Sequence, residues 1–207
     1  MKILSAAVGQ LQANCYVLCD EAAKVCAVID PGDEAERIAA AVERSGCALQ
    51  YILLTHGHYD HFTGVAGLLK RYDVPVYIHP DDAQTGSGNP WALKFPRLDE
   101  AHQRWYGEGD TLTLGSLILH VLSTPGHSRG SVVLQVADVL FTGDTLFAGS
   151  CGRTDLPGGD FGQICTSLAR LGKLEGDYHV LPGHGELSEL SRERSYNSYM
   201  IQAMSRE

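Results

Sequence analysis

Short apolar runs separated by turn residues dominate the first quarter of the chain. They cover residues 2–8, 14–19 and 25–29 and are rich in Val, Ile, Leu and Cys, which is typical of β-strands. Asp30-Pro31-Gly32 then interrupts the apolar pattern and predicts a turn. A further run at 49–54 predicts a fourth strand.

A three-and-four spacing of apolar residues predicts helices elsewhere. Over 34–45 the apolar positions include Ile38 and Val42; we expect Asp33 to cap this helix and Gly46 to end it. Further helices are expected over 61–72, 161–172 and 188–204.

The second half of the chain alternates strand-like runs with turns. The expected strands cover 74–78, 111–122 with a break at Gly115-Ser116, 131–136, 138–142 and 178–181. Residues 84–98 predict an irregular segment with a helical turn near 91–95. In each half several strands precede a helix, which is consistent with a duplicated β-β-α arrangement.

Composition predicts an ordinary globular protein. The 207 residues are 44% hydrophobic and 20% charged, which suits one domain over 1–207 with a substantial core. The formal net charge of −9 and the lack of a Lys/Arg block argue against nucleic-acid binding. No apolar stretch has the length of a membrane span, and no membrane partner is expected.

The cysteine pattern favours a reducing compartment. Six cysteines occur without a C-x-x-C pair, which favours free thiols over disulfides or a structural zinc site. The N-terminal apolar run is too short for a secretory signal. We therefore expect a cytoplasmic protein; the sequence specifies no oligomeric state.

Side chains that can bind a metal come directly after the predicted strand at 49–54. Residues 55–61 read Thr-His-Gly-His-Tyr-Asp-His and place His56, His58, Asp60 and His61 on one loop. Imidazole and carboxylate are the ligands that borderline divalent metals prefer. A His-rich polar loop without a metal is the simpler alternative, but four such groups at this spacing favour a metal site.

Three later positions repeat this pattern. His127, Asp144 and His184 each come after a strand-like run and a Gly or Pro turn. Glycine before such a residue allows the chain to turn sharply at the strand end. Each turn alone is weak evidence for a ligand, but all three share the setting of the loop at 55–61.

These motifs together resemble the metallo-β-lactamase superfamily. The matching motifs are the 55–61 loop, Pro125-Gly126-His127, Gly143-Asp144 and Gly183-His184, in the same order and at similarly wide spacing. The resemblance implies an α/β fold, the αββα four-layer sandwich, with metals at one edge of two packed sheets.

The resemblance also implies two divalent metal ions, with zinc as the first choice and iron or manganese as alternatives. The first ion would be bound by His56, His58 and His127, the second by Asp60, His61 and His184, and both by Asp144. A bridging hydroxide would then attack a carbonyl, with Asp60 and Asp144 as catalytic groups. Thr55 and Asp30 would orient ligand imidazoles, although Asp30 also fits a purely structural turn.

Within the superfamily the chain is most similar to short bacterial glyoxalase II-type enzymes. Asp144 and the run from Gly143 to Arg153 carry this similarity. It implies a glutathione thioester substrate, S-2-hydroxyacylglutathione such as S-lactoylglutathione, with Arg153 contacting glutathione. An ion pair between Arg153 and Asp155 is the alternative role.

Two features depart from the glyoxalase II pattern. Asp155 stands where an aromatic residue helps to hold glutathione, and only 23 residues follow His184, where longer members carry a basic helical region. Arg192 and Arg194 lie in this tail beside Glu189 and Glu193, which predicts a solvated helix face.

Two other functions remain open at this level. A persulfide dioxygenase of the same superfamily would use one iron, bound by His56, His127 and Asp144. A non-catalytic binding module usually loses ligands, whereas all seven are present here. Nucleic-acid cleavage is disfavoured by the acidic charge balance and by the lack of an inserted recognition domain.

Overall fold

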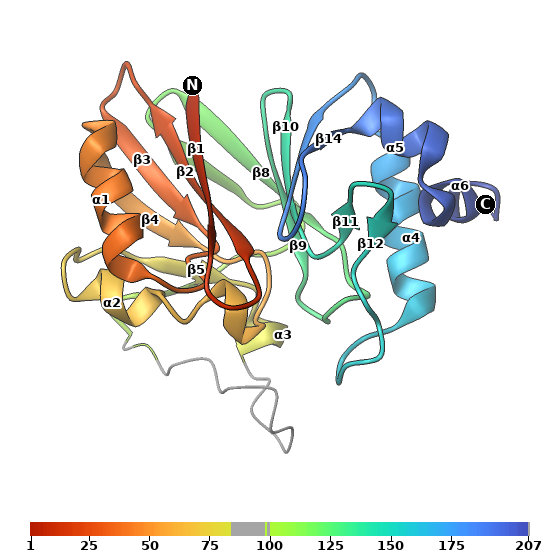
Figure 1. Cartoon of the computed structure of the whole chain (residues 1–207), viewed down its shortest axis with the longest axis horizontal. Coiled ribbons are helices and arrows are strands. Elements are labelled where there is room, and N and C mark those ends of the chain that lie inside the picture. The colour runs from red at the N-terminus through yellow and green to blue at the C-terminus, as the bar shows by residue number, and fades with distance from the viewer. Residues whose placement is uncertain (84–97, 99, 207) are drawn as a thin grey trace.

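Two six-stranded sheets face each other in the computed structural model, which describes residues 1–83, 98 and 100–206 (Figure 1). In spatial order the first sheet contains β1 (Lys2–Val8), β2 (Ala13–Asp20), β3 (Val25–Ile29), β4 (Ala48–Leu53), β5 (Val76–Ile78) and β6 (Gln103–Trp105). The second contains β14 (Ser188–Glu189), β13 (His179–Pro182), β10 (Val139–Gly143), β9 (Val132–Val136), β8 (Leu117–Ser123) and β7 (Thr111–Leu114). A separate hairpin pairs β11 (Leu146–Phe147) with β12 (Ser150–Cys151).

Helices cover the outer face of each sheet. Those on the first sheet are α1 (Ala35–Ser45) and α2 (Val65–Leu69), with α3 (Pro80–Ala83) below them in Figure 1. Those on the second are α4 (Phe161–Gly172), α5 (Leu190–Tyr196) and α6 (Ser198–Met204). The expected αββα sandwich is therefore confirmed.

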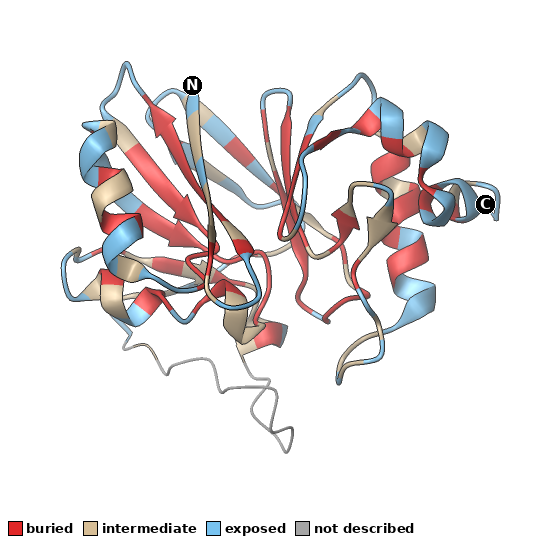
Figure 2. Cartoon of the chain, viewed as in Figure 1, coloured by how far each residue is buried: buried red, intermediate tan, exposed pale blue. Residues whose placement is uncertain are grey.

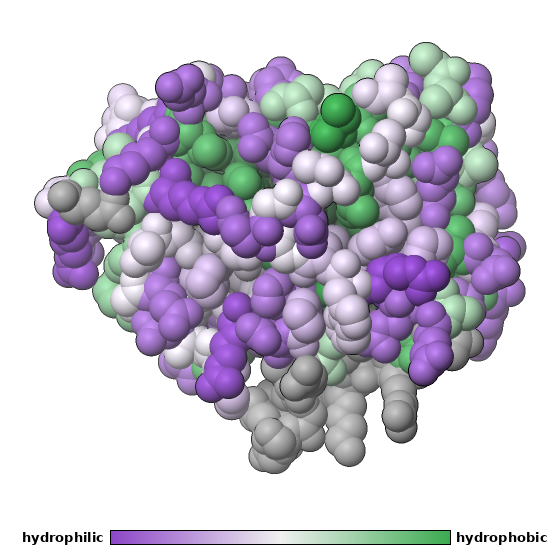
Figure 3. Space-filling model, turned by 180° about the vertical axis from the view of Figure 1, so that it is seen from behind, coloured by the Kyte–Doolittle hydropathy of each residue, from purple (hydrophilic) through white to green (hydrophobic). Residues whose placement is uncertain are grey.

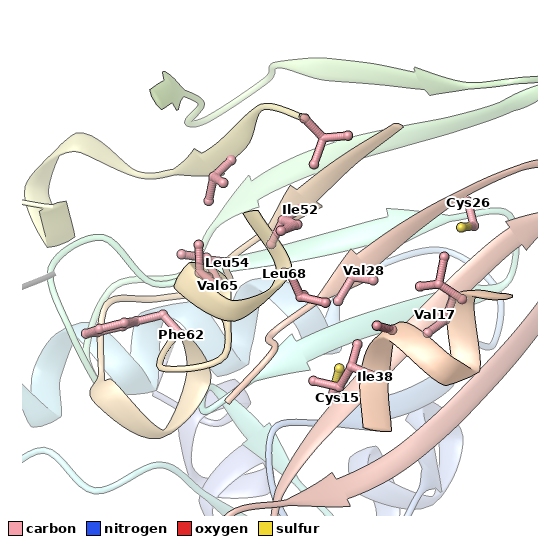
Figure 4. Packing of buried hydrophobic residues seen from close by; sticks show 14 of the residues in the cluster. Cys15, Val17, Cys26, Val28, Ile38, Ile52, Leu54, Phe62, Val65 and Leu68 are labelled. Carbon is pink, nitrogen blue, oxygen red and sulfur yellow. The ribbon is translucent and has the colours of Figure 1, made fainter. Parts of the chain in front are cut away.

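Three apolar layers hold the sandwich together. Tyr16, Leu53, Leu134 and Phe141 belong to the layer between the sheets. The layer under α1 and α2 is shown in Figure 4, where Ile38 and Leu68 face strand residues such as Val28. A third layer lies under α4 to α6. Buried residues accordingly concentrate along the strands and on the inner sides of the helices (Figure 2).

Most predicted strands are present, and the break at Gly115-Ser116 is the turn of the β7–β8 hairpin. β6 was not predicted: Gln103–Trp105 is short and mostly polar, and it is a strand because it pairs in parallel with β5 at the sheet edge. The predicted helical turn near 91–95 lies outside the described residues.

Three helix predictions need correction. Asp33 does not cap α1: Glu34 is the N-cap residue, in a left-handed conformation, and Asp33 accepts only from the Glu34 amide. The helix expected over 61–72 is a 3-10 turn at Tyr59–His61 followed by the short α2, because the ligand-bearing loop occupies its first turn. The helix expected over 188–204 is divided at Asn197, whose side chain accepts from Tyr199 N and Met200 N and caps α6.

All six cysteines are free thiols, as expected. Among the described residues, no helix combines the length and apolarity needed to span a bilayer. The face opposite to that of Figure 1 is mostly hydrophilic, with smaller hydrophobic areas between the polar groups (Figure 3).

Candidate metal centre

Strand direction brings the candidate ligands to one edge of the sandwich. β3 and β4 run in parallel and end at Asp30 and at the 55–61 loop. In the second sheet β10 and β13 run in parallel, and β8 has the same direction because β9 is antiparallel to both β8 and β10. His127, Asp144 and His184 follow the ends of β8, β10 and β13.

Backbone hydrogen bonds join the two sheets at this edge. Val132 N donates to Thr55 O at 2.9 Å, and Asn14 N donates to Gly183 O at 2.7 Å. At the end of β10 the chain turns at Gly143 (φ +48), where a Cβ would lie 2.3 Å from Thr55 Oγ1. Glycine there lets Asp144 approach the 55–61 loop.

The first group of donors consists of His56, His58 and His127, whose ligand atoms all lie within 4.8 Å of one another. The distance from His58 Nδ1 to His127 Nε2 is 2.7 Å. The His56 ring is perpendicular to that of His58, with 4.8 Å between centroids. The three rings thus surround one point from different directions.

The second group consists of Asp60, His61 and His184. His184 Nε2 lies 3.1 Å from Asp60 Oδ2 and 3.2 Å from His61 Nε2, and His61 Nε2 lies 3.6 Å from Asp60 Oδ2. These are short distances between three potential donors of a metal.

Asp144 lies between the two groups. Its Oδ2 is 3.5 Å from His127 Nε2 and 3.7 Å from His184 Nε2, while its Oδ1 is 3.5 Å from His61 Nε2. One carboxylate therefore faces donors of both groups, as a bridging ligand does.

The donor set fits a pair of divalent metal ions. Among the described residues, His56 Nε2 and Asp144 Oδ1 are buried side-chain atoms with no hydrogen-bond partner, which is costly unless something binds them. Two atoms each about 2.0–2.2 Å from a tetrahedral ion lie roughly 3.5 Å apart. The separations around Asp144 match that spacing, so the residues present can hold the metals that the sequence predicted.

Asp30 orients the imidazole of His61 directly and that of His56 through Thr55. Its Oδ2 lies 3.1 Å from His61 Nδ1 and accepts from Thr55 Oγ1 at 2.7 Å. Because the Thr55 hydroxyl proton is used in that bond, Thr55 Oγ1 is left to accept from His56 Nδ1 at 3.1 Å. Both rings then direct Nε2 toward the centre, as predicted for Thr55 and Asp30.

Backbone carbonyls orient two further rings. His127 Nδ1 lies 2.8 Å from Arg153 O, and His184 Nδ1 lies 3.2 Å from Leu11 O. Each ring donates through Nδ1 and presents Nε2 to the centre, whereas His58 presents Nδ1 to the same region. Only the tertiary structure assigns these ring atoms.

Protonation differs between the two groups when no metal is bound. Burial lowers the pKa of His56 well below its usual value, and burial together with His127 lowers the pKa of His58 to about 4. Burial also disfavours charge on His61, but Asp144 and Asp30 more than offset it and raise its pKa to about 9.

Polar residues outside the donor groups have other partners. His102 pairs with Asp73 and His179 pairs with Glu189, and neither histidine belongs to a donor group among the described residues. Arg153 forms a bidentate ion pair with Asp155, both bonds 2.7 Å long, which is the alternative role stated for it. Its contact with glutathione stays a prediction.

The solvated helix face expected around Arg192 and Arg194 is confirmed for Glu189 and Arg192, which are exposed, and wrong for Glu193. Glu193 is buried and accepts from Gly149 N, Ser188 Oγ and Asn197 Nδ2 at 2.5–2.8 Å. It therefore ties α5 to the β11–β12 hairpin that leads to Arg153. Arg194 donates to backbone carbonyls at and just after the C-terminal end of α4, those of Gly172, Leu174 and Gly176, so its role is structural.

Asp82 is a buried acid beside the centre that the sequence pattern did not single out. The available signal was its place directly after a strand, in the run His79-Pro80-Asp81-Asp82. That signal is weak, because polar residues after strands are common in loops.

Comparisons with known proteins agree with this geometry. A family model described as the metallo-beta-lactamase superfamily matches residues 8–184. The probable metallo-hydrolase YqgX of Bacillus subtilis is 36% identical over 93% of this chain and 94% of that protein. Hydroxyacylglutathione hydrolase GloC of Haemophilus influenzae is 32% identical over 93% of this chain and 95% of that protein.

Solved structures show the same fold. BLEG-1, a B3 metallo-beta-lactamase, superposes with a TM-score of 0.83 at 32% identity and covers 96% of this chain and 99% of its own. ETHE1 from Myxococcus xanthus gives a TM-score of 0.83 at 26% identity, covering 99% and 90%. TTHA1623 in a di-iron-bound form gives 0.79 at 36% identity, covering 95% and 99%.

Proposed function

Because the chain belongs to the metallo-beta-lactamase superfamily, we propose that it is a dinuclear metal hydrolase of S-2-hydroxyacylglutathione thioesters, such as S-lactoylglutathione. The products would be glutathione and a 2-hydroxy acid. The observation that carries the proposal is Asp144, whose carboxylate lies 3.5–3.7 Å from donors of both groups. Such a site is built for two ions that share one ligand.

His56, His58 and His127 would hold one metal and Asp60, His61 and His184 the other. Bound there, two divalent cations supply a hydroxide nucleophile near neutral pH and polarise a carbonyl. Asp144 sets the separation of the two positions. Asp30 and Thr55 keep the Nε2 atoms of His61 and His56 directed inward, which orients both rings for metal binding.

Zinc is our first choice of metal, with iron and manganese as alternatives. Imidazole and carboxylate donors accept all three, and metal availability decides among them as much as geometry. The similar structure of TTHA1623 is of a di-iron-bound form, which supports iron as the first alternative.

The glutathione part of the proposal rests on a relative's name and on Arg153. GloC, similar along nearly all of this chain, is named a hydroxyacylglutathione hydrolase. The Arg153 side chain is 63% exposed beside the centre, and its carbonyl holds the ring of His127. A glutathione carboxylate could replace Asp155 as the partner of this guanidinium.

A direct test combines elemental analysis with a thioester assay. We expect purified protein to contain two metal ions per chain and to hydrolyse S-lactoylglutathione, followed by loss of thioester absorbance. Protein that holds two metals but leaves S-lactoylglutathione intact, while cleaving a non-glutathione thioester, would overturn the substrate and retain the chemistry.

Replacing Arg153 with Ala should raise KM for S-lactoylglutathione about 5-fold with little change in kcat, because an exposed ion pair contributes only modestly to binding. Steady-state kinetics would measure both constants. Asp155→Ala is the matched control. It frees the Arg153 guanidinium from its ion pair, so KM for S-lactoylglutathione should stay at the original value or fall. An unchanged KM in Arg153→Ala would place the glutathione contact elsewhere.

A mononuclear iron dioxygenase acting on glutathione persulfide is the second candidate. Its support is that His56, His127 and Asp144 form a two-histidine, one-carboxylate triad within the larger site. Hydrolysis is preferred because Asp60, His61 and His184 complete a second donor group. Oxygen uptake with glutathione persulfide by iron-loaded protein, without thioesterase activity, would reverse this preference.

We further propose that the chain acts as one domain, on a small molecule, in the cytoplasm. The apolar layer shared by both sheets supports the first point. The net charge of −9 favours a small-molecule substrate over nucleic acid, and six free cysteines suit a reducing compartment.

A further inference from the structure

Asp82 is a fully buried carboxylate on α3, next to the first donor group. Its Oδ2 accepts from Gly57 N at 2.8 Å and from Ser128 Oγ at 2.6 Å, and its Oδ1 accepts from Gly130 N at 2.7 Å. These three donors are uncharged. Burying a carboxylate costs several kcal/mol, and such hydrogen bonds offset that cost only where the geometry is kept.

The three donors belong to the two loops that carry the first donor group. Gly57 lies between His56 and His58, and Ser128 directly follows His127. One side chain therefore connects the loop after β4 to the loop after β8. At the second donor group, Asp30 Oδ2 lies 3.1 Å from His61 Nδ1.

Each of the two loops has a glycine that lies so close to Asp82 that a larger residue would clash with it. A Cβ on Gly57 would lie 2.8 Å from the Asp82 carbonyl oxygen, and a Cβ on Gly130 would lie 2.8 Å from Asp82 Cγ. Neither glycine has a positive φ, so the requirement for glycine there comes from space and not from backbone conformation.

We propose that Asp82 is a positioning residue, which sets the geometry of the His56–His58–His127 metal site by holding its two loops in register. It acts on the loops of this site through its hydrogen bonds to Gly57, Ser128 and Gly130. The proposal rests on the metal centre of the proposed function but not on its substrate. Asp30 differs from Asp82 because it contacts His61 of the second group directly and reaches His56 of the first group through Thr55.

The test measures each metal site separately with Co²⁺ as a spectroscopic probe. In a His184→Ala background only the first site is intact, and in a His58→Ala background only the second. We expect Asp82→Asn to weaken Co²⁺ binding roughly 10-fold or more in the first background and less than 2-fold in the second. Asn keeps the size of Asp82 but points an NH₂ group at a donor.

Asp20→Asn is the matched control, because Asp20 is also buried and also accepts from neutral donors, including Ser116 N at 2.6 Å and Ser116 Oγ at 2.7 Å. It lies at the end of β2, far along the chain from the ligands. It should lower the melting temperature without changing Co²⁺ affinity in either background. Equal weakening of both sites by Asp82→Asn would show a general structural role and overturn the proposal.

Ser128→Ala keeps the test decisive if Asp82→Asn does not fold. It removes one of the three donors and leaves the carboxylate, so first-site Co²⁺ affinity should fall about 3-fold with the second site unchanged. Unchanged first-site affinity in a folded variant would overturn the proposal. Because the readout needs no substrate, failure to cleave S-lactoylglutathione would not affect it.

Discussion

Replacing Asp144 with Ala should lower kcat on S-lactoylglutathione by about 1000-fold or more. Asp144 is the only one of the seven candidate ligands expected to contact both metals, and its two oxygens face His61 on one side and His127 and His184 on the other. Removing it separates the two sites and leaves each with one ligand fewer. We expect metal content to fall below two ions per chain.

Kinetics and elemental analysis on the same preparation check this result. Asp138→Ala serves as control, since Asp138 is an exposed carboxylate (65%) beside His179, at the start of β10 rather than at its ligand end. That variant should keep both metals and full turnover. An Asp144→Ala protein with more than about a tenth of the original kcat would contradict the bridging role.

Removing the metals with a chelator should abolish hydrolysis and lower the melting temperature by roughly 8–16 °C for each ion that was bound at 1000 times its Kd. Ligands that bind only the folded state stabilise it by about 4 kcal/mol at 1000 times Kd, and each kcal/mol is worth about 2–4 °C for a chain of this size. The ring of His127 lies 4.9 Å from that of His56 and 4.5 Å from that of His58, and the rings of His61 and His184 lie 5.1 Å apart, so a bound cation links several segments of the chain.

Calorimetry with and without chelator, followed by restoration with Zn²⁺, measures the change. The Asp144→Ala variant provides an internal comparison, because a chelator should shift its melting temperature less. A protein shown by elemental analysis to be free of metal, yet melting at the original temperature, would separate metal binding from folding stability.

Local pattern predicted the elements whose cause is local. The helix expected over 161–172 is α4, because its apolar spacing is regular and Asp160 accepts from Gln163 N to cap it. The strand-like run at 111–122 was also predicted, with a break at Gly115-Ser116 that the structure shows to be the turn of the β7–β8 hairpin. β6 was not, because a short polar segment is a strand only through its neighbour β5.

The same distinction between local and tertiary causes applies to the metal centre. By itself the sequence determined the fold family and the candidate donors, since His, Asp and Gly at strand ends are visible as residue types in order. Tertiary structure alone decided that Arg153 pairs with Asp155, that Glu193 is buried, and that Asp82 joins loops 25 and 48 residues away. Those contacts depend on which loops are neighbours at the sheet edge, and the periodicity of the sequence does not predict which loops these are.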